Sequence, residues 1–555
     1  MNRNTESHFA ENPTSLDIKR SIFDRSTTLK TSFNAGELVP IFVDEVLPGD
    51  TFKLDTALVV RMSTPIHPVM DNCYLDLYYF FVPNRLSWDH WKEFNGENRE
   101  GYWTQTTEYE IPQITSPLVG GWEKGSLADY MGVPIGVTGL PVNALPFRDY
   151  CIIWNEWFRD QNLQQPAAVS TSDTNVAGKN SSESEDPILT APAGGSLLPV
   201  NKYHDYFTSA LPEPQKGPDV TIPLADMAPV KTSPNDLVLG PNYSMHLRSI
   251  TGDYLNSRVP LYAGDAANSG ALSGIGTETQ LPGVTYYPAN LFADLSGAVS
   301  PTINSLRQAF QLQKLYEKDA RGGSRYVEII KAHFGVVSPD ARQQRPEYLG
   351  GKRVPINVSQ VLQTSSTDDT SPQGNTAAYS LTADRSSSFT KSFTEHGFII
   401  GLACVRTEHT YQQGLEKMWS RRKRFDYYWP VFANIGEQPI LNKEIYAQGT
   451  AASAQDEEVF GYQEAWAEYR YKPARTSGAL RSTYAQSLDV WHYGDKYDAL
   501  PVLGTKWIQE TKANIDRTLA VQSSVEDQFI GDFYFKNICT RPMPVYSIPG
   551  LIDHH

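Results

Sequence analysis

Glycine and proline punctuate the whole chain, and this feature most restricts its fold. The 555 residues include 39 Gly and 37 Pro. Proline interrupts helices and central strands, and glycine adopts backbone angles that other residues avoid. Aromatic residues, which favour strands, make up 12% of the sequence. Together these residues predict a mainly β protein whose strands are joined by long loops.

Segments with the period of a strand lie near both ends of the chain. They are residues 51–60, 73–82, 396–405 and 528–535. In the first of them, Phe52, Leu54 and Leu58 alternate with Lys53 and Asp55, as expected for a strand with one buried face. Strands at both ends, separated by long excursions, predict an antiparallel sandwich closed by the N- and C-terminal strands.

Two segments have helical spacing instead. Residues 143–160 carry apolar side chains three and four positions apart, and so do residues 305–320. In the second segment we expect Leu306, Phe310 and Leu315 to face inward, with a Gly-Gly pair ending the helix. The prediction is therefore a β protein that also contains a few helices.

Four stretches stand apart from these elements by composition. Residues 1–35 are polar with charges of both signs, which predicts an N-terminal arm that orders only against something else. Residues 164–199 and 363–389 are rich in Ser, Thr, Asn, Pro and Gly, which predicts long surface loops. Residues 219–298 carry seven acidic residues against three Lys or Arg. They predict an acidic insertion between two core elements.

The charge and the cysteines restrict the partners and the compartment. The net charge is −15, whereas a protein dedicated to duplex DNA is usually basic, so any nucleic-acid contact must be local or come from a basic partner. Four widely spaced cysteines are predicted to be buried free thiols: Cys73, Cys151, Cys404 and Cys539. The N-terminus lacks an apolar signal region, and no apolar stretch could span a bilayer. We therefore expect a soluble protein made in a cytosol, without membrane insertion.

The sequence carries no motif of a known active site. It has no His-Glu-x-x-His, no nucleophile elbow, no P-loop and no complete dinucleotide fingerprint, so we predict no catalytic, cofactor or metal site. A structural calcium ion would need only oxygen ligands, and nothing localises one. The carboxylate pairs at 368–369 and 457–458 fit solvated loops better than a catalytic dyad. An alternative is a carbohydrate-binding or glycoside-cleaving β protein, with Trp and Tyr lining a groove.

Basic and aromatic residues interleave in two places, and this composition suits single-stranded nucleic acid, which is held by positive charge and by stacking. A solvated face explains the same composition, as do arginines that pair with carboxylates of a neighbouring subunit, and both interpretations stay open. The candidate nucleic-acid-binding residues are Lys417, Arg421, Arg422, Lys423, Arg424, Trp466, Arg470, Tyr471, Lys472 and Arg475.

Several short motifs occur together in a fixed order. They start with Phe-Asn-Ala-Gly-Glu-Leu-Val-Pro at 33–40 and Thr-Pro-Ile-His-Pro-Val-Met-Asp at 64–71. The others lie at 78–85, 88–91, 145–150, 154–160, 306–310, 316–323, 333–336, 346–351, 426–430, 460–463 and 468–471. In their order and coverage they resemble the major capsid protein family of the Microviridae, specifically its gokushovirus branch. No single motif decides this resemblance, and none of them marks an active site.

The resemblance implies a fold and an assembly. The fold would be a single viral β-jelly-roll over residues 36–555, an eight-stranded antiparallel sandwich with very long inter-strand loops. The assembly would be a small icosahedral shell with T=1 symmetry around a circular single-stranded DNA genome. Gokushoviruses carry a large insertion that forms protrusions at the three-fold axes, and residues 219–298 match it by position and character.

The resemblance also implies partners and a location. The chain would bind other copies of itself, the genome on its inner surface, a small basic DNA-packaging protein and a minor spike or pilot protein. The insertion would contact a receptor on the host surface. The chain would be a structural protein of the virion, assembled in the cytoplasm of a bacterial host, and would not be an enzyme.

Overall fold

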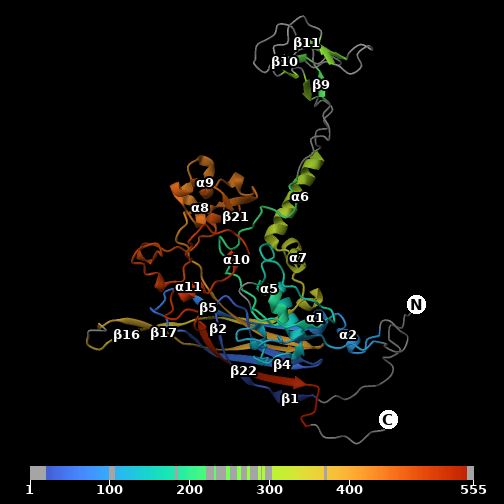
Figure 1. The fold of residues 1–555 in the computed structure, drawn as a ribbon, viewed down its shortest axis with the longest axis vertical. Helices are drawn as coiled ribbons and strands as arrows, with labels where there is room; N and C mark the ends of the chain where they lie inside the picture. Colours follow the sequence, from blue (N-terminus) through green and yellow to red (C-terminus); the bar gives the residue numbers. More distant parts are fainter. Residues whose placement is uncertain are drawn as a thin grey trace. The chain divides into compact units, whose positions relative to one another are not determined.

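A computed structural model describes residues 20–98, 107–181, 185–220, 303–367 and 372–546, together with six short strands between residues 230 and 293 (Figure 1). The chain divides into two compact units: Met1–Lys216 with Glu317–His555, and Gly217–Tyr316. The larger unit contains a five-stranded and a four-stranded sheet, whose neighbouring strands all run antiparallel.

The first sheet brings the two ends of the chain together. Its strands follow the order β2 (Thr27–Phe33), β22 (Phe529–Arg541), β4 (Thr51–Met62) and β18 (Thr382–Ser392), and β1 (Ser21–Asp24) also pairs with β22. Alternate residues of β4 and β22 are buried, which is the pattern of a strand with one face on a core. Phe52, Leu54 and Leu58 are among the buried residues, so the alternation expected from the sequence is confirmed.

The second sheet is more deeply buried than the first. Its strands follow the order β3 (Val39–Val46), β19 (Gly397–Thr407), β5 (Cys73–Pro83) and β15 (Glu347–Pro355). Nearly every residue of β19 is buried, because both of its faces are covered. Gly401 is needed there, since a Cβ atom would lie 2.7 Å from the ring of Tyr79.

Side chains of the two sheets meet in one hydrophobic core. The hydroxyls of Thr56 in β4 and Tyr79 in β5 are 2.6 Å apart. The Tyr79 ring lies 5.7 Å from that of Phe389 in β18, and the rings of Phe42 in β3 and Phe535 in β22 are 5.1 Å apart. Aromatic side chains from strands distant in sequence therefore fill the space between the sheets.

Two long excursions leave this framework, one between β5 and β15 and the other between β19 and β22. The first contains α4 (Leu145–Ile153), which continues as a π-helical turn over Trp154–Phe158, then α6 (Ile303–Gly322) and α7 (Tyr326–Phe334). Both helices expected from the sequence are present. The one-turn helices of the larger unit are α1 (Asn84–Ser87), α2 (Trp91–Phe94), α3 (Leu127–Tyr130), α5 (Pro187–Thr190), α8 (Asn442–Ile445), α9 (Ser453–Asp456), α10 (Thr505–Ile508) and α11 (Ala513–Asp516).

The apolar residues of α6 do not face inward as the sequence predicted. Phe310 is 60% exposed and Leu315 is 44% exposed, whereas Leu306 is half-buried. That part of the prediction is wrong, because helical spacing shows where apolar residues lie but not whether their partner belongs to the same chain. Exposed apolar side chains on a helix are typical of a surface that another molecule covers.

Strands also replace two stretches that composition marked as irregular. Residues 21–33, expected in the arm, form β1 and β2, and Phe33 is fully buried, whereas residues 1–19 lie outside the described part. Residues 376–389, expected in a loop, belong to β17 (Thr376–Ser380) and β18. The loop prediction is wrong there, since Thr and Ser also occupy the solvent face of a strand.

The unit Gly217–Tyr316 contains all of the proposed insertion, residues 219–298. Its strands are β9 (Val230–Thr232), β10 (His246–Ser249), β11 (Val259–Ala263), β12 (Leu272–Gly274), β13 (Tyr286–Pro288) and β14 (Leu291–Ala293). They pair as one four-stranded and one two-stranded antiparallel sheet. The acidic side chains that marked residues 219–298 lie outside the described part, except that of Asp219.

The remaining small sheets belong to the loops. They are β6 (Gln113–Thr115) with β7 (Pro141–Asn143) and β8 (Val176–Ala177), the pair β16 (Val358–Leu362) and β17, and the pair β20 (Glu437–Leu441) and β21 (Val459–Glu464). All four cysteines are buried free thiols, as expected. No helix in the described ranges is long and apolar enough to cross a bilayer.

Candidate nucleic-acid interface

The basic–aromatic cluster, defined as residues 417–429 and 466–475, lies in the excursion between β19 and β22. The paired strands β20 and β21 support it, together with a small hydrophobic core that includes Phe207, Ile440 and Phe460. Short 3-10 turns at Lys417–Ser420 and Arg424–Asp426 carry the basic residues. The cluster therefore consists of irregular backbone supported by a strand pair and a small hydrophobic core.

The two segments of the cluster meet in space. The guanidinium of Arg421 donates to the carboxylate of Glu468 over 2.8 Å and lies 4.3 Å from the centre of the Tyr469 ring. The ring of Tyr428 packs edge-on against Trp466 with centroids 5.7 Å apart. Residues 38 or more positions apart thus form one surface, which the sequence suggested only by their similar composition.

A basic loop projects from this surface. The backbone N–H groups of Arg422 and Lys423 both donate to one carboxylate oxygen of Asp426 over 2.7 Å, and these hydrogen bonds lower the pKa of Asp426. The guanidinium of Arg424 lies 4.8 Å from the centre of the Trp429 ring. Among the described residues, no carboxylate lies within 4.0 Å of the charged groups of Arg422, Lys423 and Arg424, so these three cations are available to a ligand.

The other cations of the cluster have acidic neighbours in the same chain. Arg470 contacts Glu464 at 2.6 Å, and Lys472 and Arg475 contact Glu416 at 3.5 and 3.2 Å. These pairs are exposed, so each contributes little to stability and can exchange its partner. The pairing of arginine with carboxylate that the sequence left open is present here, but within one chain.

The ten candidate residues differ in accessibility. Arg422, Lys423, Arg424, Arg470, Tyr471, Lys472 and Arg475 are exposed, Lys417 and Arg421 are half-buried, and Trp466 is buried. Trp466 is 5% exposed, and its indole N–H donates to the carbonyl of Phe432 over 2.8 Å. It is not a surface on which a base can stack, and this corrects the prediction, because a tryptophan next to charged residues is not thereby exposed.

Other aromatic rings of the cluster are accessible to a ligand. Trp419 and Phe425 are 67% and 68% exposed, and Tyr427 and Tyr471 are more than half exposed. Phe425 was missed by the sequence analysis, although its place between Arg424 and Asp426 was a usable signal. Trp419, Phe425 and Tyr427 lie on either side of the free cations at 422–424 in the sequence, and rings next to free cations suit the bases and phosphates of a single strand.

A pocket of about 350 Å³ opens between the two segments. Lys417 and Arg421 of the first segment and Tyr471, Lys472 and Arg475 of the second line it. Basic residues outnumber acidic ones in this lining, although the chain as a whole is strongly acidic. Tyr206 and Phe207 of the other excursion also line the pocket, and no sequence pattern indicated them.

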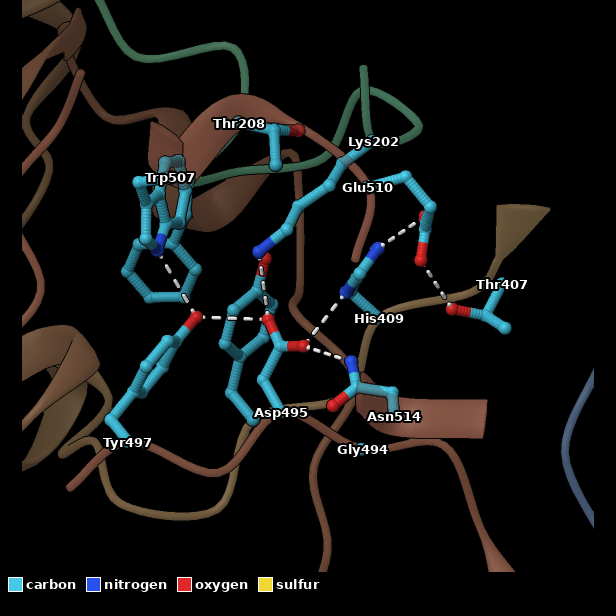
Figure 2. Close-up of polar contacts among 12 residues, drawn as sticks. Lys202, Thr208, Thr407, His409, Gly494, Asp495, Tyr497, Trp507, Glu510 and Asn514 are labelled. Atoms are coloured by element: carbon cyan, nitrogen blue, oxygen red, sulfur yellow. Dashed lines mark hydrogen bonds and ion pairs between the residues drawn. The ribbon is translucent and has the colours of Figure 1, made fainter. Parts of the chain in front are cut away.

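A buried ion network lies deeper, where the two excursions meet the end of β19 (Figure 2). It consists of Lys202, His409, Asp495 and Glu510, whose side chains are each 5% exposed or less. Asp495 lies 3.1 Å from the ammonium of Lys202 and 3.0 Å from Nδ1 of His409. Nε2 of His409 lies 2.9 Å from Glu510, which also accepts from the hydroxyl of Thr407 in β19.

The charges of the network compensate one another. Burial alone would lower the pKa of His409, but the carboxylates of Glu510 and Asp495 outweigh burial and raise that pKa to about 10. Burial would raise the pKa of Asp495, but Lys202 and His409 outweigh it and hold that pKa well below its usual range. Two cations and two anions are thus paired, which buried charges require. The network joins the excursions to the second sheet and has no unpaired group that could act on a substrate.

The network could not be found from the sequence, because its members come from four separated segments. No group of three or more His, Cys, Asp or Glu in the described part could hold a metal ion. The arrangement supports binding by exposed cations and rings, held on a scaffold of buried ion pairs.

Comparisons with known proteins identify the family. A family model described as "Capsid protein (F protein)" matches residues 11–551. The chain is 44% identical to the capsid protein VP1 of Bdellovibrio phage phiMH2K, over 99% of this chain and 98% of that protein. It is 43% identical to VP1 of Chlamydia phage 1, over 98% of each, and 44% identical to VP1 of Spiroplasma virus 4, over 94% and 93%. The chain therefore belongs to the F capsid protein family of the Microviridae, as a structural protein of a phage virion and not an enzyme.

Proposed function

We propose that copies of this chain assemble through a jelly-roll domain into a T=1 icosahedral shell around a circular single-stranded DNA genome. The observation that carries the proposal is the family match over residues 11–551, with relatives aligned over nearly their full length. Two further features of the structure support it.

The first is the strand order. With β2, β3, β4, β5, β15, β18, β19 and β22 numbered one to eight in chain order, the two sheets have the orders 1-8-3-6 and 2-7-4-5. This order supports the eight-stranded jelly roll that we propose, in which two antiparallel sheets would face each other. The side-chain contacts between β4 and β5 and between β3 and β22 agree with such a sandwich.

The second is the apolar surface. Val119, Phe334 and Val431 are each more than three-quarters exposed, and α6 and the basic–aromatic cluster expose further large apolar side chains. A monomer seldom exposes so many, whereas a shell subunit covers them with neighbouring copies. Aromatic and arginine side chains at such contacts contribute most of the binding energy.

The exposed part of the basic–aromatic cluster is our candidate for a DNA-facing surface inside the shell. Arg422, Lys423 and Arg424 supply free charge and Trp419 and Phe425 supply exposed rings, which is the chemistry that single strands require. Because the chain is acidic overall, a separate small basic packaging protein would neutralise most of the genome. A minor spike or pilot protein would complete the particle.

Residues 219–298 are our candidate for a protrusion at the three-fold axes that contacts a host receptor. They fall within a compact unit of their own, Gly217–Tyr316. A separate unit fits an insertion whose sequence can vary without destabilising the two sheets. Deleting them should leave shell assembly intact and abolish attachment to the host. Loss of assembly, or attachment at the wild-type level, would contradict this role.

Assembly itself is tested by electron microscopy and sedimentation of the purified chain with single-stranded DNA. We expect closed particles of uniform size. A chain that stays monomeric at high concentration, with and without DNA, would contradict the proposed function.

A further inference from the structure

A second cavity, of about 480 Å³, lies on the outer face of the second sheet, away from the shared core. Tyr78 and Phe80 of β5 point into it, because they alternate with Tyr79, which points toward the first sheet. The lining also includes Trp157 and Phe158, at the end of the π-helical turn, and residues 201–204. A volume of this size is typical of sites that bind small ligands.

One side of this cavity is a wall of aromatic rings. Phe158 packs edge-on against Tyr78 at 5.2 Å between centroids and against Phe80 at 6.1 Å. Trp157 packs against Phe80 at 5.4 Å and against Tyr348 at 5.8 Å. The rings hold one another in place, so the wall is rigid and suited to a planar aromatic ligand.

The other side of the cavity is basic. Arg159 and Arg325 both line it, and the charge of Arg325 joins burial in lowering the pKa of Arg159. Arg325 is held firmly, because its guanidinium donates to Glu328 over 2.9 Å and to the carbonyl of Asn155 over 2.7 Å. Asp160 and Glu328 also line the cavity and offset part of this charge, but basic side chains outnumber them in the lining, which favours binding of an anion.

Three guanidinium groups of the lining have hydrogen-bonding capacity left. The Nε–H groups of Arg159, Arg325 and Arg406 are buried, and none of them donates a hydrogen bond within the described part of the chain. The other nitrogens of Arg406 donate to Asp76, to the hydroxyl of Tyr78 and to the carbonyl of Asn201, so this side chain is fixed. Because these Nε–H groups are buried, and that of Arg325 lies 3.8 Å from a carboxylate oxygen of Glu156, an anionic ligand would be attracted by the charge of the guanidinium groups and would reach the Nε–H groups only after the side chains shift.

We propose that this cavity binds a nucleotide, with the base against Tyr78 and Phe158 and the phosphate at Arg159 and Arg325. The chemistry is shared by a free nucleotide and by one unit of a single DNA strand. The site does not depend on the proposed role of the basic–aromatic cluster, since it uses different residues. His204 lines this cavity and Tyr206 lines the pocket of the cluster, so only about 8 Å of backbone separates the two linings.

Titration calorimetry on the purified full-length chain tests the proposal, with 5′-deoxyadenosine monophosphate as the probe. We expect saturable binding of one nucleotide per chain, and weaker binding of inorganic phosphate and of deoxyadenosine, because each carries half of the recognised chemistry. Binding of phosphate as tightly as the nucleotide, or no saturable binding of the nucleotide, would overturn it.

Variants assign the binding to the cavity. Arg159→Gln should weaken nucleotide binding about tenfold or more, as expected for loss of a charge-assisted contact. Arg159→Lys should recover part of the affinity, and Phe158→Leu should weaken nucleotide binding but not phosphate binding. The matched control is Arg61→Gln at an exposed position of β4, which should leave nucleotide binding unchanged. Equal affinities of wild type and Arg159→Gln, with thermal unfolding showing both folded, would overturn the assignment.

A short oligothymidylate distinguishes the two sources of the nucleotide. If the ligand is a unit of the genome, the oligothymidylate should compete with the mononucleotide, and particles filled with DNA should show density in the cavity that empty particles lack. If the mononucleotide binds without competition, the site takes a free nucleotide. If Arg422→Gln loses oligothymidylate binding and keeps mononucleotide binding, the oligothymidylate binds at the basic–aromatic cluster and the mononucleotide binds in this cavity. The two proposals can then fail independently.

Discussion

The buried ion network and the basic–aromatic cluster use the same kinds of side chain in opposite ways. In the network, Lys202 and His409 are enclosed and each is paired with a carboxylate. In the cluster, Arg422 and Arg424 are exposed, and no carboxylate of the described residues neutralises them. The difference teaches that pairing and burial, rather than residue type, separate a group that holds the fold from a group that can hold a ligand.

Of the substitutions proposed here, one that breaks the buried ion network should have the largest effect on stability. Asp495→Ala removes the carboxylate that faces Lys202, His409 and Asn514 and leaves buried charge uncompensated. We expect a loss of about 3–5 kcal/mol in the free energy of unfolding, measured by denaturant titration. The matched control is Glu457→Ala, which removes the exposed partner of Lys443 and should cost about 1 kcal/mol or less. Similar losses of stability in both variants would show that a buried ion pair contributes no more to stability than an exposed one.

Two of the three tryptophans of the cluster, Trp466 and Trp419, extend the same contrast. Trp466 is buried, so Trp466→Ala should lower the free energy of unfolding by about 3–5 kcal/mol. Trp419 is exposed, so Trp419→Ala should leave stability nearly unchanged and weaken oligothymidylate binding by about 1–3 kcal/mol. Unfolding curves and fluorescence anisotropy measure the two effects. Stability loss on replacing Trp419 would count against an exposed binding role.

The network also predicts how stability depends on pH. The pKa of His409 is raised from 6.5 to about 10, so its contribution is complete below about pH 6.5 and is lost as the pH rises toward about 10. The pKa of Asp495 is lowered, so its contribution is present above about pH 4 and is lost as the pH falls. We expect the wild-type melting temperature to fall between pH 7 and pH 10. His409→Gln should flatten this fall, and an unchanged slope would contradict the assignment.

The smallest effect on stability should come from the basic loop. Neutralising Arg422, Lys423 and Arg424 together with Gln should change the free energy of unfolding by no more than about 0.5 kcal/mol, because all three are exposed. Oligothymidylate binding should weaken, and the slope of log K against log salt should fall by about 2, as expected for three phosphate contacts to a single strand. An unchanged salt dependence would show that these cations do not contact phosphate.

The strands were predictable because their signal is local. Alternation in β4, β5 and β22 appears within a few residues, and the structure places those strands where the pattern indicated. Strands were missed where the strand that pairs with them is distant in the sequence. Nothing near residues 21–33 in sequence reveals that β22, some 500 positions later, pairs with them.

The candidate site was predictable only in part. Composition located the two basic–aromatic segments, and they do meet in space. Composition could not show that Trp466 is buried or that the chain contains a buried ion network. It also could not show that Glu416 and Glu464 form ion pairs with three cations of the cluster. These facts depend on contacts between segments of the fold, which no local pattern encodes.

The most direct test of the whole account is a cryo-electron microscopy reconstruction of the particle that this chain forms with its genome. We predict a closed shell with one copy of the chain per asymmetric unit, with α6 covered by neighbouring copies and with residues 422–424 against DNA density on the inner surface. A reconstruction with residues 422–424 on the outer surface would contradict the DNA-facing role. Failure of the chain to form any closed shell would contradict the central claim.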